Sequence, residues 1–271
     1  LCLADEAEAS AVDLPGVHII PATALGLLNL PFLRLKYSAT ELCCALKPYL
    51  LRHLVTRGGP GRYVYIDADI SVYARLDALI DGLDEADFVV TPHMTAPFPG
   101  SWDGRVKPTQ GDLLYAGLLN AGVFAMRAGD AAVAFLDTWA TLVTQPGAFM
   151  PAFGGQHEQH AFNWILAFVE RVRILRDPAI NVGYWNLHDR SLRWLGLDDG
   201  TGWTVNGQPL VCFHFSGFAP EQPFRLSRHE GRYLVHLMPS VERLLTDYRA
   251  RLHQHGWRSG QANGYPHARF P

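Results

Sequence analysis

The segment Tyr63-Val-Tyr-Ile-Asp67-Ala-Asp69 joins a run of four apolar and aromatic residues to two acids. A continuous run of this kind is typical of a strand that is covered on both faces, as in a parallel sheet. Side chains alternate along a strand. We therefore expect Asp67 and Asp69 to leave the strand end on the same side, while Ala68 turns toward the core.

Two carboxylates held at one spot repel each other, and a divalent cation with oxygen ligands relieves that repulsion. Ligands of open α/β sheets bind at the carboxyl ends of strands, where this pair is expected. Asp67 and Asp69 are therefore candidate metal ligands. The alternative is that they are two surface acids that cap the following helix, which is the usual outcome for an isolated Asp-x-Asp.

Strand and helix patterns alternate along the rest of the chain. Ser38 and Glu41 have the spacing of a capping box, which predicts a helix from Ser38 to about Thr56. The alternation predicts an α/β fold with a largely parallel sheet and helices on both faces. Further strands are expected at 1–4, 88–91, 122–127, 172–175 and 210–215, and further helices at 74–83, 131–143, 158–169 and 241–253.

The chain has 271 residues, of which 48% are apolar, and this suits one α/β domain. We expect that domain to span residues 1–255, with a loose C-terminal tail over 256–271. The stretch 93–112 is rich in Pro and Gly and is a candidate lid.

The formal charge of -3 and the lack of a basic stripe argue against a nucleic-acid partner. Cys2, Cys43, Cys44 and Cys212 show no CxxC spacing, which favours a reducing, cytoplasmic compartment. No apolar run reaches membrane-spanning length, so at most a peripheral contact with the inner face of a membrane is expected.

Four segments follow one another in a recognisable order: a helix with Lys47 before the two acids, Leu119-Asn120-Ala-Gly122, Glu158-Gln159-His-Ala-Phe-Asn163 and His214-Phe-Ser-Gly217. Together they resemble the glycogenin-like, family 8 group of GT-A glycosyltransferases. The resemblance implies a Rossmann-like GT-A fold that transfers a sugar from a nucleotide diphosphate donor, a UDP-sugar by the same resemblance, to a hydroxyl of a glycan or glycolipid with retention. The first strand of that fold is missing here, which indicates a trimmed chain or part of a longer one.

The resemblance also implies individual roles. Asp67, Asp69 and His214 would hold Mn²⁺ or Mg²⁺, although a His at a strand end is more often structural. Donor-binding roles would fall to Lys47, Asp67, Asn120, Gly122 and Gly217.

Gln159 and Glu158 match a pair that flanks the reacting carbon, with Glu in place of the family's Asp. If the reaction inverts instead, Glu158 or His157 becomes the natural general base. The plainer alternatives are that Glu158 begins a helix, where a negative charge is favourable, and that Lys47 is a solvated helix residue.

The run Asn181-Val-Gly-Tyr184-Trp185-Asn186-Leu-His188-Asp-Arg190 resembles a segment of bacterial cell-surface polysaccharide glycosyltransferases. Tyr184, Trp185, Asn186 and His188 are therefore candidate acceptor or sugar contacts. Core packing is the common alternative for the two aromatic rings.

The chain departs from the family pattern after His214-x-x-Gly217, where the family carries a Lys and this sequence does not. Arg225 or Arg228 is a candidate replacement. Two other functions stay open. One is a haloacid dehalogenase-like, Mg²⁺-dependent phosphohydrolase, with Asp67 as nucleophile, Asp69 as acid/base and Asp198 and Asp199 at the metal. The other is a non-catalytic sugar-binding domain.

Overall fold

A computed structural model describes residues 2–3, 15–100, 104–145, 158–196 and 202–257. Contacts divide the chain into two compact units whose segments interleave. Unit 1 takes in Leu1–Tyr63 and Met126–Val172, and unit 2 takes in Val64–Ala125 and Arg173–Ala262. The predicted boundary at residue 255 stays untested, because the predicted tail falls almost wholly outside the described residues.

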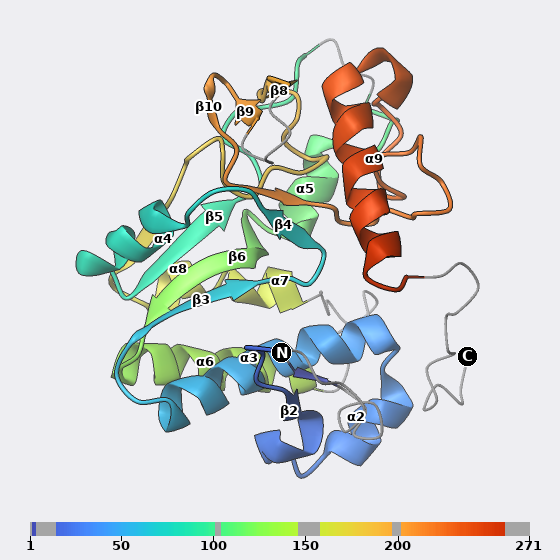
Figure 1. Cartoon of the computed structure of the whole chain (residues 1–271). Coiled ribbons are helices and arrows are strands. Elements are labelled where there is room, and N and C mark those ends of the chain that lie inside the picture. The colour runs from blue at the N-terminus through green and yellow to red at the C-terminus, as the bar shows by residue number, and fades with distance from the viewer. Residues whose placement is uncertain (1, 4–14, 101–103, 146–157, 197–201, 258–271) are drawn as a thin grey trace. The chain divides into compact units, whose positions relative to one another are not determined.

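Unit 1 is built mainly on two long helices, α3 (Ala39–Arg57) and α6 (Asp130–Thr144), which pack side by side (Figure 1). The capping box that opens α3 is confirmed: Ser38 Oγ accepts from the Glu41 backbone N–H, and the Ser38 N–H donates to Glu41 Oε2. Smaller elements complete the unit: β1 (Cys2–Leu3), β2 (Ile20–Pro21), η1 (Ala22–Leu25), α2 (Leu30–Lys36), α7 (Glu158–Phe162) and α8 (Ile165–Phe168).

The single helix expected over 158–169 is two short helices, α7 and α8. The break falls at Asn163, whose side-chain amide donates to the backbone carbonyls of Gln159 and His160. An Asn side chain that bonds the preceding turn competes with the helical backbone hydrogen bonds. The backbone there tightens into bonds of three-residue spacing, from Asn163 N to His160 O and from Trp164 N to Ala161 O.

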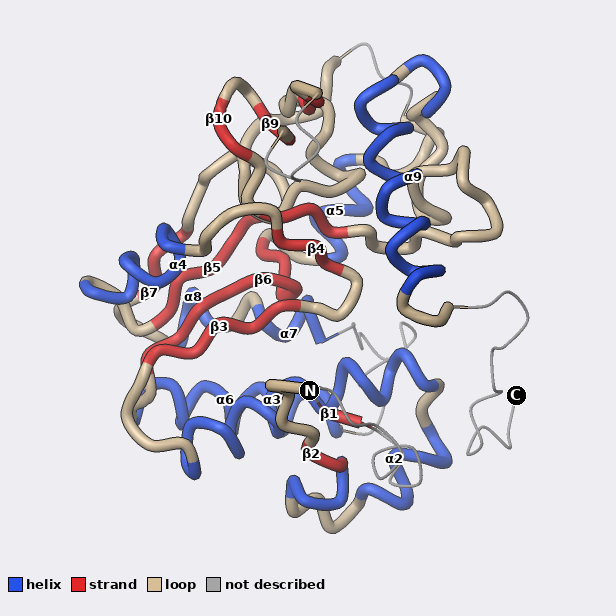
Figure 2. The backbone as a smooth tube through the Cα atoms, viewed as in Figure 1, coloured by secondary structure: helices blue, strands red, loops and turns tan. Residues whose placement is uncertain are grey.

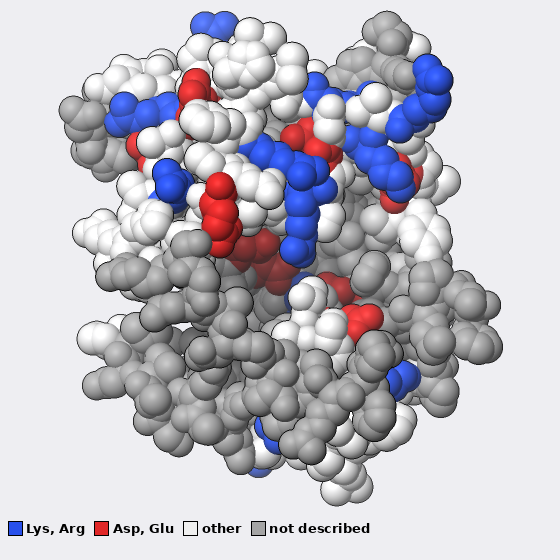
Figure 3. Space-filling view, turned by 90° about the vertical axis from the view of Figure 1, so that its right-hand side faces the viewer, with Lys and Arg blue, Asp and Glu red and all other residues white. Residues whose placement is uncertain are grey.

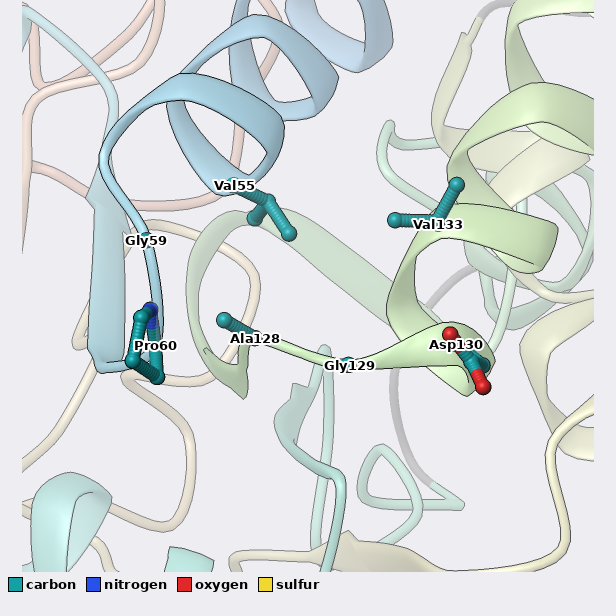
Figure 4. A pocket seen from close by; sticks show the side chains of 7 residues that line it. All are labelled: Val55, Gly59, Pro60, Ala128, Gly129, Asp130 and Val133. Atoms are coloured by element: carbon teal, nitrogen blue, oxygen red, sulfur yellow. The ribbon is translucent and has the colours of Figure 1, made fainter.

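One shallow pocket of about 300 Å³ lies in unit 1, where α3 ends and α6 begins (Figure 4). Its walls are small or apolar apart from one acid, Asp130. None of the predicted site residues lines it; the lining residues are Val55, Gly59, Pro60, Ala128, Gly129, Asp130 and Val133.

The largest sheet has the strand order β3-β6-β5-β7, and Figure 2 shows β3, β6 and β5 side by side. Asp67 N–H donates to the Gly122 carbonyl, and Ala128 N–H donates to the Gly61 carbonyl. Residue numbers therefore fall along one strand as they rise along the other, so β6 runs antiparallel to β3. The sheet is mixed rather than largely parallel. Its strands are β3 (Arg62–Ile66), β5 (Phe88–Pro92), β6 (Leu119–Arg127) and β7 (Val172–Ile174).

The α/β class is confirmed, whereas membership of the GT-A fold stays a prediction. The sequence patterns missed β2, η1 and α2 in unit 1. The elements of unit 2 that they missed are β4 (Ile70–Val72), α5 (Gln110–Ala116), β8 (Leu192–Trp194), β9 (Trp203–Val205), β10 (Gln208–Pro209) and η4 (Val235–Leu237). The helix expected over 74–83 is replaced by the shorter α4 (Asp77–Asp81) and a 3₁₀ turn, η2 (Gly82–Asp84). The strand expected over 210–215 is β11 (Cys212–His214), and the helix expected over 241–253 is α9 (Pro239–Gln254). Residues 101–103 of the candidate lid lie outside the described residues.

Two apolar clusters hold unit 2 together. In one, Leu79 and Leu83 pack against Val89 and Val123 of the sheet. In the other, which is larger, α9 contributes Leu244 and Leu245, both fully buried. None of the described helices is both long and apolar enough to cross a bilayer.

Candidate metal centre

Asp67, Asp69 and His214 converge in unit 2. Their candidate ligand atoms all lie within 4.8 Å of one another. His214 Nε2 is 3.1 Å from Asp69 Oδ1 and 3.9 Å from Asp67 Oδ2. The imidazole is buried, and both acids are partly exposed.

A turn, rather than strand alternation, brings the two acids together. β3 ends at Ile66, and the Ile70 N–H donates to the Asp67 carbonyl, which closes a tight turn between β3 and β4. Ala68 is exposed at this turn, so the expectation that it points toward the core is wrong. The period of two held only as far as the strand, because the chain reverses direction directly after it.

Pairing between β4 and β11 brings His214 to the acids. These strands are antiparallel, with His214 opposite Ile70. The Phe215 N–H then donates to the Asp69 carbonyl at 2.9 Å. The backbone that follows the acids is therefore hydrogen-bonded to the backbone that carries the imidazole.

Gly122, on β6, lies against the side chains of His214, Asn120 and Asp67. The Asp67 N–H donates to its carbonyl at 2.8 Å. A Cβ at position 122 would lie 2.6 Å from His214 Cε1, 2.8 Å from Asn120 Oδ1 and 3.0 Å from Asp67 Oδ2. Any side chain here would displace the imidazole or a carboxylate, so this position requires glycine.

The donor set fits a hard divalent cation. Around an octahedral ion with bonds of about 2.1 Å, neighbouring ligand atoms lie roughly 3.0 Å apart and opposite ones roughly 4.2 Å apart. The His214 Nε2 distances of 3.1 and 3.9 Å fall within that range. Two carboxylates and one imidazole leave further coordination positions for phosphate oxygens or water, and they suit Mn²⁺ as well as Mg²⁺.

A buried chain of hydrogen bonds runs from His214 into the protein. His214 Nδ1 lies 3.2 Å from Asn181 Oδ1, and Asn181 Nδ2 donates to Asn120 Oδ1 at 2.9 Å. Asn120 Nδ2 lies 3.1 Å from His93 Nε2, and His93 Nδ1 lies 2.7 Å from the Gly117 carbonyl. Burial lowers the pKa of His93 to about 4, so its ring is neutral near pH 7.

No role is predicted from the sequence for His93, and Asn181 is included only as the first residue of the predicted sugar-contact run. His93 directly follows β5 as Asp67 directly follows β3, so the rule that ligands gather at strand ends could have found it. Asn181 has a φ of 55°, a left-handed conformation that Asn tolerates better than most residues. The residues around Asn181 in the sequence do not predict this left-handed conformation.

The predicted sugar-contact run divides into buried and accessible residues. Trp185 is buried and packs edge-on against His214, with ring centroids 5.1 Å apart. Asn186 is fully buried, and its amide bonds the Gly183 N–H and the carbonyls of His93 and Asn181. Tyr184 and His188 are only partly buried, and His188 Nε2 lies 2.9 Å from the Ala96 carbonyl.

Gly217, three residues after His214, packs closely against His229 and Ser227. Its φ is +70°, and a Cβ there would lie 2.5 Å from His229 Cδ2 and 2.7 Å from Ser227 Oγ. Arg228 N–H donates to the Gly217 carbonyl. Glycine at 217 thus brings exposed Arg228 and His229 close to the segment that carries the imidazole, whereas Arg225 bonds the carbonyls of Ser227 and Arg228.

Three further candidates lie in unit 1. Lys47 Nζ and Glu158 Oε1 form an ion pair of 2.8 Å, and both residues are buried. The Trp139 indole N–H donates to the Glu158 carbonyl, which anchors the start of α7. Gln159, the next residue, is partly buried. Whether Lys47, Glu158 or Gln159 contacts a donor stays a prediction, and His157, Asp198 and Asp199 lie outside the described residues.

Charges on the face drawn in Figure 3 are mixed. Lys and Arg side chains of the described residues lie among Asp and Glu side chains there. This distribution agrees with the small net charge of -3.

Comparison with known proteins adds one relative. The chain is 25% identical over 206 residues to the uncharacterized protein YfnF of Bacillus subtilis (strain 168). The match covers 74% of this chain and 65% of that protein, so the chain spans about two thirds of the relative's length. No family model matches the chain.

Proposed function

We propose that this chain is a metal-dependent glycosyltransferase, which transfers a sugar from a nucleotide diphosphate donor to a hydroxyl group. The observation that supports it is the convergence of Asp67, Asp69 and His214, from two segments 145 residues apart in sequence, around a point that suits a divalent cation. The motif order that resembles family 8 enzymes supports the same reading.

The proposed residues have two roles, which are to bind the metal ion and to contact the sugar. Asp67, Asp69 and His214 would hold Mn²⁺ or Mg²⁺. The ion supplies Lewis-acid neutralisation of the charge that builds on the departing nucleoside diphosphate. Tyr184 and His188 are the proposed sugar contacts. An aromatic ring such as that of Tyr184 covers the apolar face of a sugar. His188 would contribute its ring face rather than its nitrogens, because Nε2 lies 2.9 Å from the Ala96 carbonyl and Nδ1 is buried.

The donor is proposed to be a UDP-sugar, and the acceptor a glycan or glycolipid. Both rest on the family resemblance. Retention of configuration belongs to the same proposal, and it rests on the resemblance of Glu158 and Gln159 to the family's catalytic pair.

A thermal-shift and hydrolysis experiment tests the function. Melting temperature is measured with UDP, GDP, CDP or ADP, with Mn²⁺ or with EDTA. We expect one nucleotide to raise it only with Mn²⁺, because a ligand that binds the folded state stabilises it. Slow Mn²⁺-dependent release of free sugar from the matching donor is expected as well.

The matched variants are Asp69→Asn, which removes a proposed ligand, and Asp247→Asn, which removes a partly exposed acid paired with Arg243 on α9. Only Asp69→Asn is expected to abolish the Mn²⁺-dependent shift. An absence of any Mn²⁺-dependent shift with all four nucleotides would contradict the proposal. Phosphate release from p-nitrophenyl phosphate that Asp67→Asn abolishes would instead support the phosphohydrolase.

A further inference from the structure

Backbone groups determine which atom donates in each buried hydrogen bond between His93 and His214. A backbone N–H only donates and a carbonyl only accepts. The chain of side chains touches one such N–H and two such carbonyls. These three groups determine where each proton lies.

His93 is settled first. The Gly117 carbonyl accepts, so His93 Nδ1 carries the proton at that 2.7 Å contact. The ring is neutral, so His93 Nε2 has a lone pair and accepts from Asn120 Nδ2. The Gly122 N–H, which can only donate, bonds Asn120 Oδ1 at 2.9 Å and independently gives the same orientation of that amide.

Asn181 is settled next. Thr91 Oγ1 donates to the Val123 carbonyl, so its oxygen is available to accept from Asn181 Nδ2 at 2.9 Å. The same amide nitrogen donates to Asn120 Oδ1. Both hydrogens of Asn181 Nδ2 are therefore used, and Asn181 Oδ1 is left facing His214 Nδ1.

We infer that His93, Asn120 and Asn181 are positioning residues that keep the proton of His214 on Nδ1 and its Nε2 lone pair directed at the cation between Asp67 and Asp69. The inference rests on the proposed metal site and adds residues that act through His214. It also gives Asn120 a different role from the donor contact expected of it, because each polar atom of its side chain is bonded inside the protein.

The burial of these residues supports the inference. His93, Asn120 and Asn181 are 5%, 3% and 1% exposed. Buried polar groups are costly unless each one is hydrogen-bonded, so a chain of this length is retained only when every member has a partner. Metal-bound His residues commonly donate their second ring nitrogen to such a partner, which sets the tautomer and the ring orientation.

The first experiment measures the proton directly. Nitrogen-15 NMR of the His214 ring is recorded in the metal-free and Mg²⁺-bound full chain. We expect Nδ1 to be protonated in both, whatever the reaction of the protein. A His214 Nδ1 without a proton would overturn the inference and leave the proposed transferase activity standing.

The second experiment uses Asn181→Gly, because glycine accepts the left-handed backbone of position 181 without strain. Binding of Mn²⁺ alone is measured by electron paramagnetic resonance. We expect affinity about 10- to 100-fold weaker than in the wild type. His93→Phe, which keeps the ring packed on Trp185, is expected to weaken binding less, since it acts two hydrogen bonds further away.

Leu244→Ala is the control for destabilisation alone. Leu244 is fully buried in the same unit and carries no polar group. We expect a lower melting temperature with unchanged Mn²⁺ affinity and an unchanged His214 Nδ1 signal. Equal losses of affinity in Leu244→Ala and Asn181→Gly would contradict a positioning role. A wild-type chain that binds no Mn²⁺ would contradict the proposed function, and the NMR result would still decide the proton position.

Discussion

Gly122 and His214 approach each other so closely that a Cβ on the glycine would lie 2.6 Å from Cε1 of the imidazole. β6 therefore passes beside the candidate metal centre with only its backbone next to the imidazole and the Asp67 carboxylate.

Gly122→Ala is expected to weaken Mn²⁺ binding by at least ~10-fold, because the added methyl group displaces His214 or Asp67 from the ligand position. Isothermal titration of Mn²⁺ into the folded variant checks this. Gly129→Ala is the matched control, since a Cβ there would meet nothing within 4 Å. Full Mn²⁺ affinity in Gly122→Ala would show that the ligands do not need the observed packing.

Lys47→Met and Glu158→Leu are each expected to lower the free energy of unfolding by about 3–5 kcal/mol, because each leaves a buried partner without its counter-charge. The double variant Lys47→Met/Glu158→Leu is expected to recover much of that loss. Urea unfolding of the four proteins gives the coupling energy. Strict additivity of the two single losses would show that the 2.8 Å contact contributes no coupling.

Asp247→Asn, which breaks the exposed Arg243 pair on α9, is the control for that cycle. Exposed pairs of this spacing contribute about 0.3–0.5 kcal/mol. A loss no larger than this is expected.

His93 is expected to make stability fall in acid. Its pKa is about 4 in the folded chain and 6.5 as a free side chain, so the unfolded state takes up a proton first as pH falls. The contribution of neutral His93 to the free energy of unfolding is complete above pH 6.5. It is lost progressively as the pH falls toward 4, to a total of roughly 3 kcal/mol. Urea unfolding of the wild type and of His93→Phe between pH 7 and pH 4 isolates it. Parallel pH profiles for the two proteins would refute the assignment.

Ser38→Ala is expected to lower the free energy of unfolding by about 1 kcal/mol, because it removes one side of the capping box at the start of α3. Chemical denaturation of the wild type and of Ser38→Ala measures this loss of unfolding free energy. Ser38→Asp, which keeps an acceptor at the N-cap, is the control and is expected to stay within a few tenths of a kcal/mol of the wild type.

Much of the secondary structure follows from local patterns. The capping box begins α3 one residue after Ser38, and the apolar run before Asp67 forms β3. Where side chains compete with the backbone the patterns were less accurate, as at Asn163, which divides the expected last helix of unit 1 into α7 and α8. Strand direction in the sheet also escaped prediction, because direction depends on which distant strands pair.

The residue types that are available for the site follow from the amino-acid order alone. Asp67 and Asp69 could be named from an Asp-x-Asp after a strand, whereas His214 could be named only from the resemblance to family 8 enzymes. Their convergence came from tertiary structure: a reversing turn after β3, the β4–β11 pairing, and a glycine on β6 that leaves room for the ring. The direction of the buried bonds from His93 to His214 was likewise decided only in the folded chain, because it depends on backbone N–H and carbonyl groups that folding brings to the same place.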